Sequence, residues 1–263
     1  MTTILSSTST PLSASLQAGS VILTLNRPER ANSFNFEMAT ELQRALADAE
    51  KNPQVRCVVL TGAGEVFSAG QDISEMQQGE VVSYREHLDK TYNPLVLQIR
   101  GMGKPVVAAI NGPCAGAAFG VALACDLRIA ADEARFVVGF SGIGLVPDSG
   151  VSLFLPALIG LGRATEFYFS NAPIDAETAL QWGMVNRVVP FNLMEAVQTT
   201  AAELAMGPIG AYGKTKLAFN KAMYPHLEEV LATEADLQEE AGRSKEHQEG
   251  VKAFLEKIIP NFL

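Results

Sequence analysis

Residues 105–125 carry no charged side chain over a length that could cross a membrane. Asn111, Gly112, Pro113 and Gly116 interrupt this segment and would break a spanning helix. The segment therefore predicts a buried strand, a turn and a buried helix at the centre of a globular core.

Further apolar runs predict the strands that would flank this centre. Several of them are apolar throughout, which is typical of strands covered on both faces of a sheet. The expected strands span 21–25, 55–60, 106–110 and 127–130, with shorter candidates at 136–138 and 187–189. Helical stretches separate most of them, and 36–50 shows the clearest helical periodicity.

Strand signals stop near Asn192, and helical periodicity takes over. It predicts four helices, at 193–206, 208–223, 227–241 and 244–259. We therefore expect an α/β core over residues 1–191 and a helical region over residues 192–263. Within the core, the Ser/Thr-rich residues 1–19 are expected to form a loosely ordered N-terminal segment.

Net charge and cysteine content limit the kinds of binding partner and the cellular compartment that we expect. The net charge of -9 argues against nucleic acid or an anionic membrane as a partner. The N-terminus lacks the basic start and apolar block of a signal peptide. Cys57, Cys114 and Cys125 have neither disulfide nor zinc-site spacing, so we expect buried thiols in a cytoplasmic protein without a bound metal.

Glycine-rich turns follow strand signals at 61–72, 111–120 and 139–150. None has the spacing of a dinucleotide fingerprint or a phosphate loop, and each alone is compatible with tight packing. Together, small residues at 69–70 and 115–118 would let two backbone segments approach a ligand closely. The second segment opens a helix, so its free N–H groups could help to form an oxyanion hole.

Asp148 is the one carboxylate within 139–150, in an otherwise apolar loop. Burial there would raise its pKa, which suits a base that removes a proton from carbon. It also precedes the apolar run 151–155, where it could serve as a helix N-cap. The residues alone support both interpretations.

Five segments carry a resemblance to a known family in the family's order and spacing. They are LNRPERANSF (25–34), FSAGQD (67–72), KPVVAAING (104–112), ALACDLRIA (122–130) and GIGLVPDSG (142–150). The chain resembles the crotonase (enoyl-CoA hydratase/isomerase) superfamily. The resemblance implies a spiral of ββα units, a helical trimerisation region at 192–263, and a homotrimer or dimer of trimers.

The resemblance also implies an acyl-CoA thioester as the substrate, with no separate cofactor. Its carbonyl would accept hydrogen bonds from the backbone N–H groups of Gln71 and Ala117. The implied CoA-binding positions are Arg30, Ala31, Ala69, Asp72, Ile73, Phe254 and Lys257. Phe254 and Lys257, three residues apart on one predicted helix, would reach the nucleotide of a neighbouring subunit.

The glutamates of the hydratases fall on Gly120 and near Phe140 or Ser141, where no acid is present. The segments YNPLV (92–96), FVVGFSGIGLVPDSG (136–150) and AGRSKEHQEGVKAFLEK (241–257) resemble those of the bacterial 1,2-epoxyphenylacetyl-CoA isomerases, which use an aspartate at the position of Asp148. This implies an isomerase of 2-(1,2-epoxy-1,2-dihydrophenyl)acetyl-CoA or of delta-3/delta-2 enoyl-CoA. The alternatives are an enoyl-CoA hydratase, an aryl-CoA dehalogenase-like enzyme and a non-catalytic acyl-CoA-binding subunit.

The remaining polar residues are expected to have structural or solvent-facing roles. Asp126 follows an uncharged helix and is predicted to be structural. His87, His226 and His247 lie in charged helical stretches and are predicted to face solvent. The acidic run 234–240 is predicted to be a solvated helix face.

Overall fold

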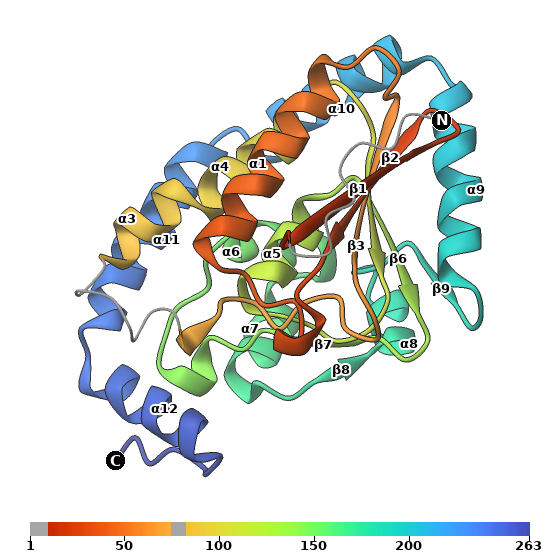
Figure 1. Ribbon diagram of the computed structural model, residues 1–263. Helices are drawn as coiled ribbons and strands as arrows, with labels where there is room; N and C mark the ends of the chain where they lie inside the picture. The colour runs from red at the N-terminus through yellow and green to blue at the C-terminus, as the bar shows by residue number, and fades with distance from the viewer. Residues whose placement is uncertain (1–9, 75–82) are drawn as a thin grey trace.

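The computed structural model describes residues 10–74 and 83–263 (Figure 1). Its main sheet has six strands in the order β1-β2-β3-β4-β6-β9. β1 (Leu12–Gln17) pairs antiparallel with β2 (Ser20–Leu25), and the other neighbours are parallel. The other members are β3 (Cys57–Gly62), β4 (Val106–Ile110), β6 (Leu127–Ala131) and β9 (Arg187–Val189).

A second, smaller sheet has the order β5-β7-β8. Its strands are β5 (Cys114–Ala115), β7 (Arg135–Val137) and β8 (Ile174–Asp175). The helices that follow or connect the strands as far as β9 are η1 (Pro28–Arg30), α1 (Phe36–Lys51), α3 (Tyr84–Lys90), α4 (Tyr92–Gly101), α5 (Gly116–Ala124), η2 (Ser141–Ile143), α6 (Val151–Ile159), α7 (Leu161–Ser170) and α8 (Ala176–Gln181). The helices after β9 are α9 (Leu193–Met206), α10 (Ile209–Met223), α11 (Leu227–Gly242) and α12 (Lys245–Glu256).

Both faces of the central strands are buried, as their continuous apolar sequences predict. Along β3, Val58 and Leu60 join the larger apolar cluster, which α1, α4 and α5 also enter. Cys57 and Val59 point to the other face and pack with residues of α9. Successive side chains of a strand point to opposite faces, so a strand covered on both sides needs apolar residues at every position.

The uncharged segment 105–125 forms β4 and the buried helix α5, as predicted. Every residue of β4 is buried, and so is every residue of α5 after Gly116. Across residues 10–74 and 83–263, no helix is long and apolar enough to cross a membrane.

The prediction of a loosely ordered segment over residues 1–19 is wrong from Leu12 onward, while residues 1–9 lie outside the described chain. Leu12–Gln17 form β1, and each residue pairs with one of β2. The turn between the strands uses Ala18 and Gly19, both with positive φ. Backbone pairing and burial of Leu12 outweigh the weak strand propensity of this Ser-rich sequence.

The helices after β9 are not a separate appendage. α9 covers one face of the main sheet, α11 packs against α3, and α12 packs against η2 (Figure 1). The predicted helix at 244–259 ends earlier, at Glu256, because Lys257 adopts the left-handed conformation. The predicted strand at 55–60 lies two residues later, at Cys57–Gly62, where it pairs in register with β2.

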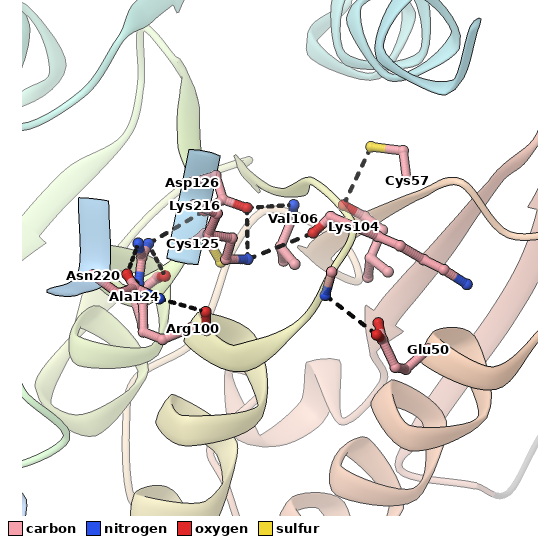
Figure 2. A network of polar contacts seen from close by, with 12 residues as sticks. Glu50, Cys57, Arg100, Lys104, Val106, Ala124, Cys125, Asp126, Lys216 and Asn220 are labelled. Carbon is pink, nitrogen blue, oxygen red and sulfur yellow. Dashed lines mark hydrogen bonds and ion pairs between the residues drawn. The ribbon is translucent and has the colours of Figure 1, made fainter. Parts of the chain in front are cut away.

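Asp126 is structural, as predicted, and links three elements (Figure 2). One carboxylate oxygen accepts a hydrogen bond from the Val106 N–H at 2.9 Å and lies 2.8 Å from the ammonium of Lys216. The other lies 3.3 Å from a guanidinium nitrogen of Arg100. Lys216 is buried, so its charge depends on Asp126 for compensation.

We expect Asp126→Ala to lower the free energy of unfolding by about 3 kcal/mol, because it leaves the Lys216 ammonium without its carboxylate partner and the Val106 N–H without an acceptor. The double variant Asp126→Ala/Lys216→Met should recover part of this loss. Urea denaturation measures both. The exposed Asp132→Ala is the control and should change stability little; an equal loss in both single variants would contradict the role of the network.

Candidate active site

A cavity of about 1370 Å³ lies where the glycine-rich turns meet α3, α11 and α12. All three catalytic residues predicted from the sequence, Gln71, Ala117 and Asp148, line it. His87 of α3 and Gln238 of α11 are further polar members of its wall. The fold therefore brings residues from distant parts of the chain to one space.

Two of the turns are joined by backbone hydrogen bonds. Ser68 and Cys114 form a parallel bridge, in which the Ala115 N–H donates to the Ser68 carbonyl at 3.0 Å. Gly70 has a φ of +90°, and a Cβ on it would lie 2.8 Å from the Ala115 carbonyl oxygen. Only glycine allows this approach, which brings the backbone before Gln71 against the start of α5.

The N–H groups of Gln71 and Ala117 donate to no acceptor within residues 10–74 and 83–263. Ala117 is in the first turn of α5, where an N–H has no partner within the helix and carries the positive end of the helix dipole. Two amides on such closely packed segments can donate to one oxygen, which is the requirement for an oxyanion hole. The N–H belongs to the backbone, so the alanine side chain at position 117 does not remove it.

Asp148 is buried, and each of its carboxylate oxygens accepts one hydrogen bond. The Ser149 hydroxyl donates to Oδ1 at 2.8 Å, and the Gln238 side-chain amide donates to Oδ2 at 2.9 Å. Burial raises the pKa of Asp148 to about 6, and these two hydrogen bonds limit the rise. Such a group is ionised at neutral pH yet basic enough to take a proton from carbon.

The interpretation of Asp148 as a helix N-cap is wrong. α6 begins after Gly150, which is its N-cap and has no side chain. The free N–H groups there are instead held by Glu234 of α11, whose carboxylate accepts from the Gly150 N–H at 2.8 Å and the Ser152 N–H at 3.0 Å. The carboxylate of Asp148 is therefore not engaged in capping.

The prediction that 234–240 is a solvated face is wrong for Glu234 and Gln238, which are 3% and 1% exposed. Both belong to the buried stripe of α11, which also contains Leu227, Leu231 and Ala235. Burial raises the pKa of Glu234 to about 7, and the charge of Asp148 adds to the rise. The spacing of the three apolar residues could have placed both polar ones on the inner face.

The histidines differ from the prediction in two of three cases. His226 is exposed, as predicted. His87 lines the cavity, where Nε2 pairs with the Gln71 side-chain oxygen at 2.9 Å, and burial lowers its pKa to about 4. His247 is buried on α12 between the Tyr84 hydroxyl and the Ile143 carbonyl. Charged residues surround His87 and His247 in the sequence, so the sequence did not indicate that these two positions face inward on their helices.

Gly120 lies where the turn after Asp148 packs onto α5. A Cβ on Gly120 would lie 2.5 Å from the Cβ of Ser149 and 2.7 Å from its carbonyl oxygen. Ser149 has a positive φ, so this turn is already conformationally restricted. The position that a glutamate occupies in the hydratases is therefore filled by the segment that holds Asp148.

Five of the seven predicted CoA-binding residues line the cavity, namely Arg30, Ala69, Asp72, Ile73 and Phe254. Ala31 and Lys257 do not belong to its described wall. Phe254 lies in the wall of its own chain's cavity, and Lys257 lies beyond the end of α12. The argument that Phe254 and Lys257 share a helix face is therefore wrong.

Asp72 has a second role besides lining the cavity. Its carboxylate forms an ion pair with Arg27 at 3.0 Å and accepts from the Ser74 N–H at 3.2 Å. Burial acts to raise the pKa of Asp72, but the hydrogen bonds from Ser74 and Arg27 outweigh it and lower this pKa below the usual value. Asp72 is therefore a poor candidate for a base, unlike Asp148.

The sequence profile of enoyl-CoA hydratase/isomerase matches residues 15–263. The chain is 41% identical over 251 residues to the 1,2-epoxyphenylacetyl-CoA isomerase of Escherichia coli (strain K12). The aligned region covers 94% of this chain and 96% of that relative. It is 39% identical over 248 residues to a probable enoyl-CoA hydratase of Rhodobacter capsulatus, covering 94% and 95%. Isomerase and hydratase names thus both occur among its relatives.

Among solved structures, the crystal structure of an enoyl-CoA hydratase from Mycobacterium avium subsp. paratuberculosis K-10 superposes with a TM-score of 0.87 at 36% identity. The match covers 96% of this chain and 98% of the other. The α/β fold of crotonase type with a helical C-terminal region, predicted from the sequence, is confirmed.

The raised pKa of Asp148 predicts how its replacement changes stability with pH. Between pH 4 and pH 6 the folded protein binds more protons at this group than the unfolded chain does, so its contribution to stability falls as the pH rises. We expect the stability of Asp148→Asn relative to the unmodified protein to increase by roughly 2–3 kcal/mol from pH 4 to pH 7.

Urea denaturation at both pH values measures this difference. Asp48→Asn, at an exposed position of α1, is the matched control for the same substitution and should change stability little. A relative stability of Asp148→Asn that stays constant with pH would contradict the burial of an ionised carboxylate.

Proposed function

The chain belongs to the enoyl-CoA hydratase/isomerase family, and we propose that within it this protein is an acyl-CoA isomerase that works through a thioester enolate. The observation that carries the proposal is Asp148, a buried carboxylate with a raised pKa in the same cavity as the amides of Gln71 and Ala117. One base and one oxyanion hole are sufficient to move a proton between two carbons.

The proposed reaction uses the base twice. Asp148 takes a proton from the carbon next to the thioester carbonyl, and the electron pair of that C–H bond delocalises onto the carbonyl oxygen. The Gln71 and Ala117 N–H groups stabilise the resulting oxyanion. With a delta-3-enoyl-CoA, the protonated Asp148 then returns the proton to C4, so that the double bond moves from C3–C4 to C2–C3 and no water is consumed.

The proposed substrates are 2-(1,2-epoxy-1,2-dihydrophenyl)acetyl-CoA or a delta-3-enoyl-CoA. The relative from Escherichia coli, whose name states the first of these activities, supports that choice. The alternatives are hydration, dehalogenation and acyl-CoA binding without turnover. Isomerisation of a delta-3-enoyl-CoA, together with no hydration of crotonyl-CoA and no chloride release from 4-chlorobenzoyl-CoA, would separate the isomerase from all three.

We propose that the CoA portion binds along Arg30, Ala31 and Ala69, with Asp72, Ile73 and Phe254 also contributing to its site. Ala31 contributes through its carbonyl, which accepts from the Ala69 N–H at 3.0 Å and so fixes this edge. Three expectations stay predictions. They are a contact from Lys257 to a neighbouring subunit, a homotrimer or dimer of trimers held by residues 192–263, and cytoplasmic localisation.

We expect Asp148→Asn to reduce kcat for a delta-3-enoyl-CoA by at least about a hundredfold, because it keeps the shape of the side chain and removes the base. Substrate binding should change little, so KM should stay close to its original value. Steady-state kinetics measures both constants. Asp48→Asn is the control, and near-normal turnover by Asp148→Asn would refute the mechanism.

Crotonyl-CoA should be a poor substrate for hydration, because no second acid occupies the position of Gly120. We expect Gly120→Glu to create no hydratase activity and to lower thermal stability, since its Cβ would overlap Ser149. Absorbance of the conjugated thioester follows hydration, and circular dichroism follows unfolding. Efficient hydration by the unmodified protein or by Gly120→Glu would contradict this assignment.

A further inference from the structure

Gln238 connects the helical C-terminal region to the carboxylate of Asp148. It is almost completely buried on α11, and its side chain has a partner at each end. Nε2 donates to Asp148 Oδ2 at 2.9 Å, while Oε1 accepts from the Val146 N–H at 3.1 Å. A backbone N–H can only donate, so the Val146 bond fixes which end of the amide faces Asp148.

The two donors hold the carboxylate from both sides. Ser149 donates to Oδ1 from the same turn, and Gln238 donates to Oδ2 from a helix ninety residues further along the chain. Rotation of the carboxylate about its Cβ–Cγ bond would break both hydrogen bonds. The plane of the carboxylate is therefore fixed, and its remaining lone pairs are left for the substrate.

We propose, given the isomerase function above, that Gln238 is a positioning residue that orients the carboxylate of Asp148 and sets its basicity. A hydrogen bond donated to a carboxylate favours the ionised form, while burial favours the neutral one. Together with Ser149, Gln238 thus favours the ionised form of a deeply buried acid, and no cation pairs with Asp148 among the described residues.

Glu234, one helical turn before Gln238, holds the same turn in a different way. Its carboxylate binds the N–H groups of Gly150 and Ser152 and makes no hydrogen bond to Asp148 among the described residues. The charge of Asp148 contributes to the raised pKa of Glu234. Near pH 6, Glu234 is mostly neutral because its pKa is raised to about 7. Glu234→Gln therefore removes neither a donor to Asp148 nor much charge, and we expect the pKa of Asp148 to stay close to its value in the unmodified protein.

Other titratable groups around the cavity come from the elements packed beside α11. Tyr84 and His87 lie on α3, His247 and Lys252 lie on α12, and Asp72 follows the first glycine-rich turn. None of them forms a hydrogen bond to Asp148 within the described residues. The direct polar contacts of its carboxylate are those of Ser149 and Gln238.

The test compares Gln238→Met, which removes the donor at similar volume, with Gln238→Glu, which keeps an acceptor for the Val146 N–H. The readout is the acid limb of the pH profile of kcat/KM, whose midpoint should follow the ionisation of Asp148 near pH 6 in the unmodified protein. Both variants should shift this midpoint upward, by about one pH unit for Met and by more for Glu, where a second acid adjoins the first.

Two controls separate positioning from general damage. Glu234→Gln should lower activity or stability without an upward shift of the midpoint. Gln198→Met, at an exposed position of α9, should change neither quantity. A loss of activity by the Gln238 variants that is uniform over pH, with the midpoint unmoved, would overturn the proposal and leave only a structural role.

A measurement that needs neither turnover nor a Gln238 variant provides a second test. In the unmodified protein, the NMR signals of the Gln238 side-chain amide protons should titrate with the midpoint of Asp148, and this titration should vanish in Asp148→Asn. Absence of the titration would overturn the role of Gln238. Active Asp148→Asn would instead refute the isomerase function, while the amide titration would still decide whether Gln238 senses the charge of Asp148.

Discussion

The site depends first on the contact between the backbone at Gly70 and the Ala115 carbonyl. A Cβ at Gly70 would come within 2.8 Å of that oxygen, so any other residue would separate the two turns. This contact places two unpaired amides at the edge of one cavity, where a carbonyl oxygen can meet both. The parallel β3 and β4 make the contact possible, because their carboxyl ends lie side by side.

Two acidic side chains of the site are buried, and nearby hydrogen-bond donors offset the loss of their hydration. Asp148 and Glu234 are both buried, and each has a raised pKa. Asp148 accepts from Ser149 of its own turn and from Gln238 of α11, and Glu234 of α11 accepts from Gly150 of that turn. No cation pairs with either acid among the described residues. The arrangement differs from that of Asp126, where Arg100 and Lys216 balance the charge and the role is purely structural.

Much of the fold and several residues that line the candidate site could be predicted from sequence, because apolar runs and glycine-rich turns indicate which segments are buried. β4, β9 and α9 match their predicted bounds. The residues that surround the base could not be predicted in this way. Glu234, Gln238 and His247 lie in charged stretches. Their burial depends on contacts with segments 84 to 104 residues earlier, which local periodicity does not record.

The bond between Asp148 and Gln238 spans ninety residues, and this separation has a consequence for biosynthesis. A ribosome releases the sheet and both amide-bearing turns well before α11 leaves the exit tunnel. A nascent chain at that stage can fold its apolar centre but still lacks the partner that fixes Asp148. The geometry of the candidate site is therefore completed late, once α11 docks against α3. An incomplete chain would have both amides before it had an oriented carboxylate.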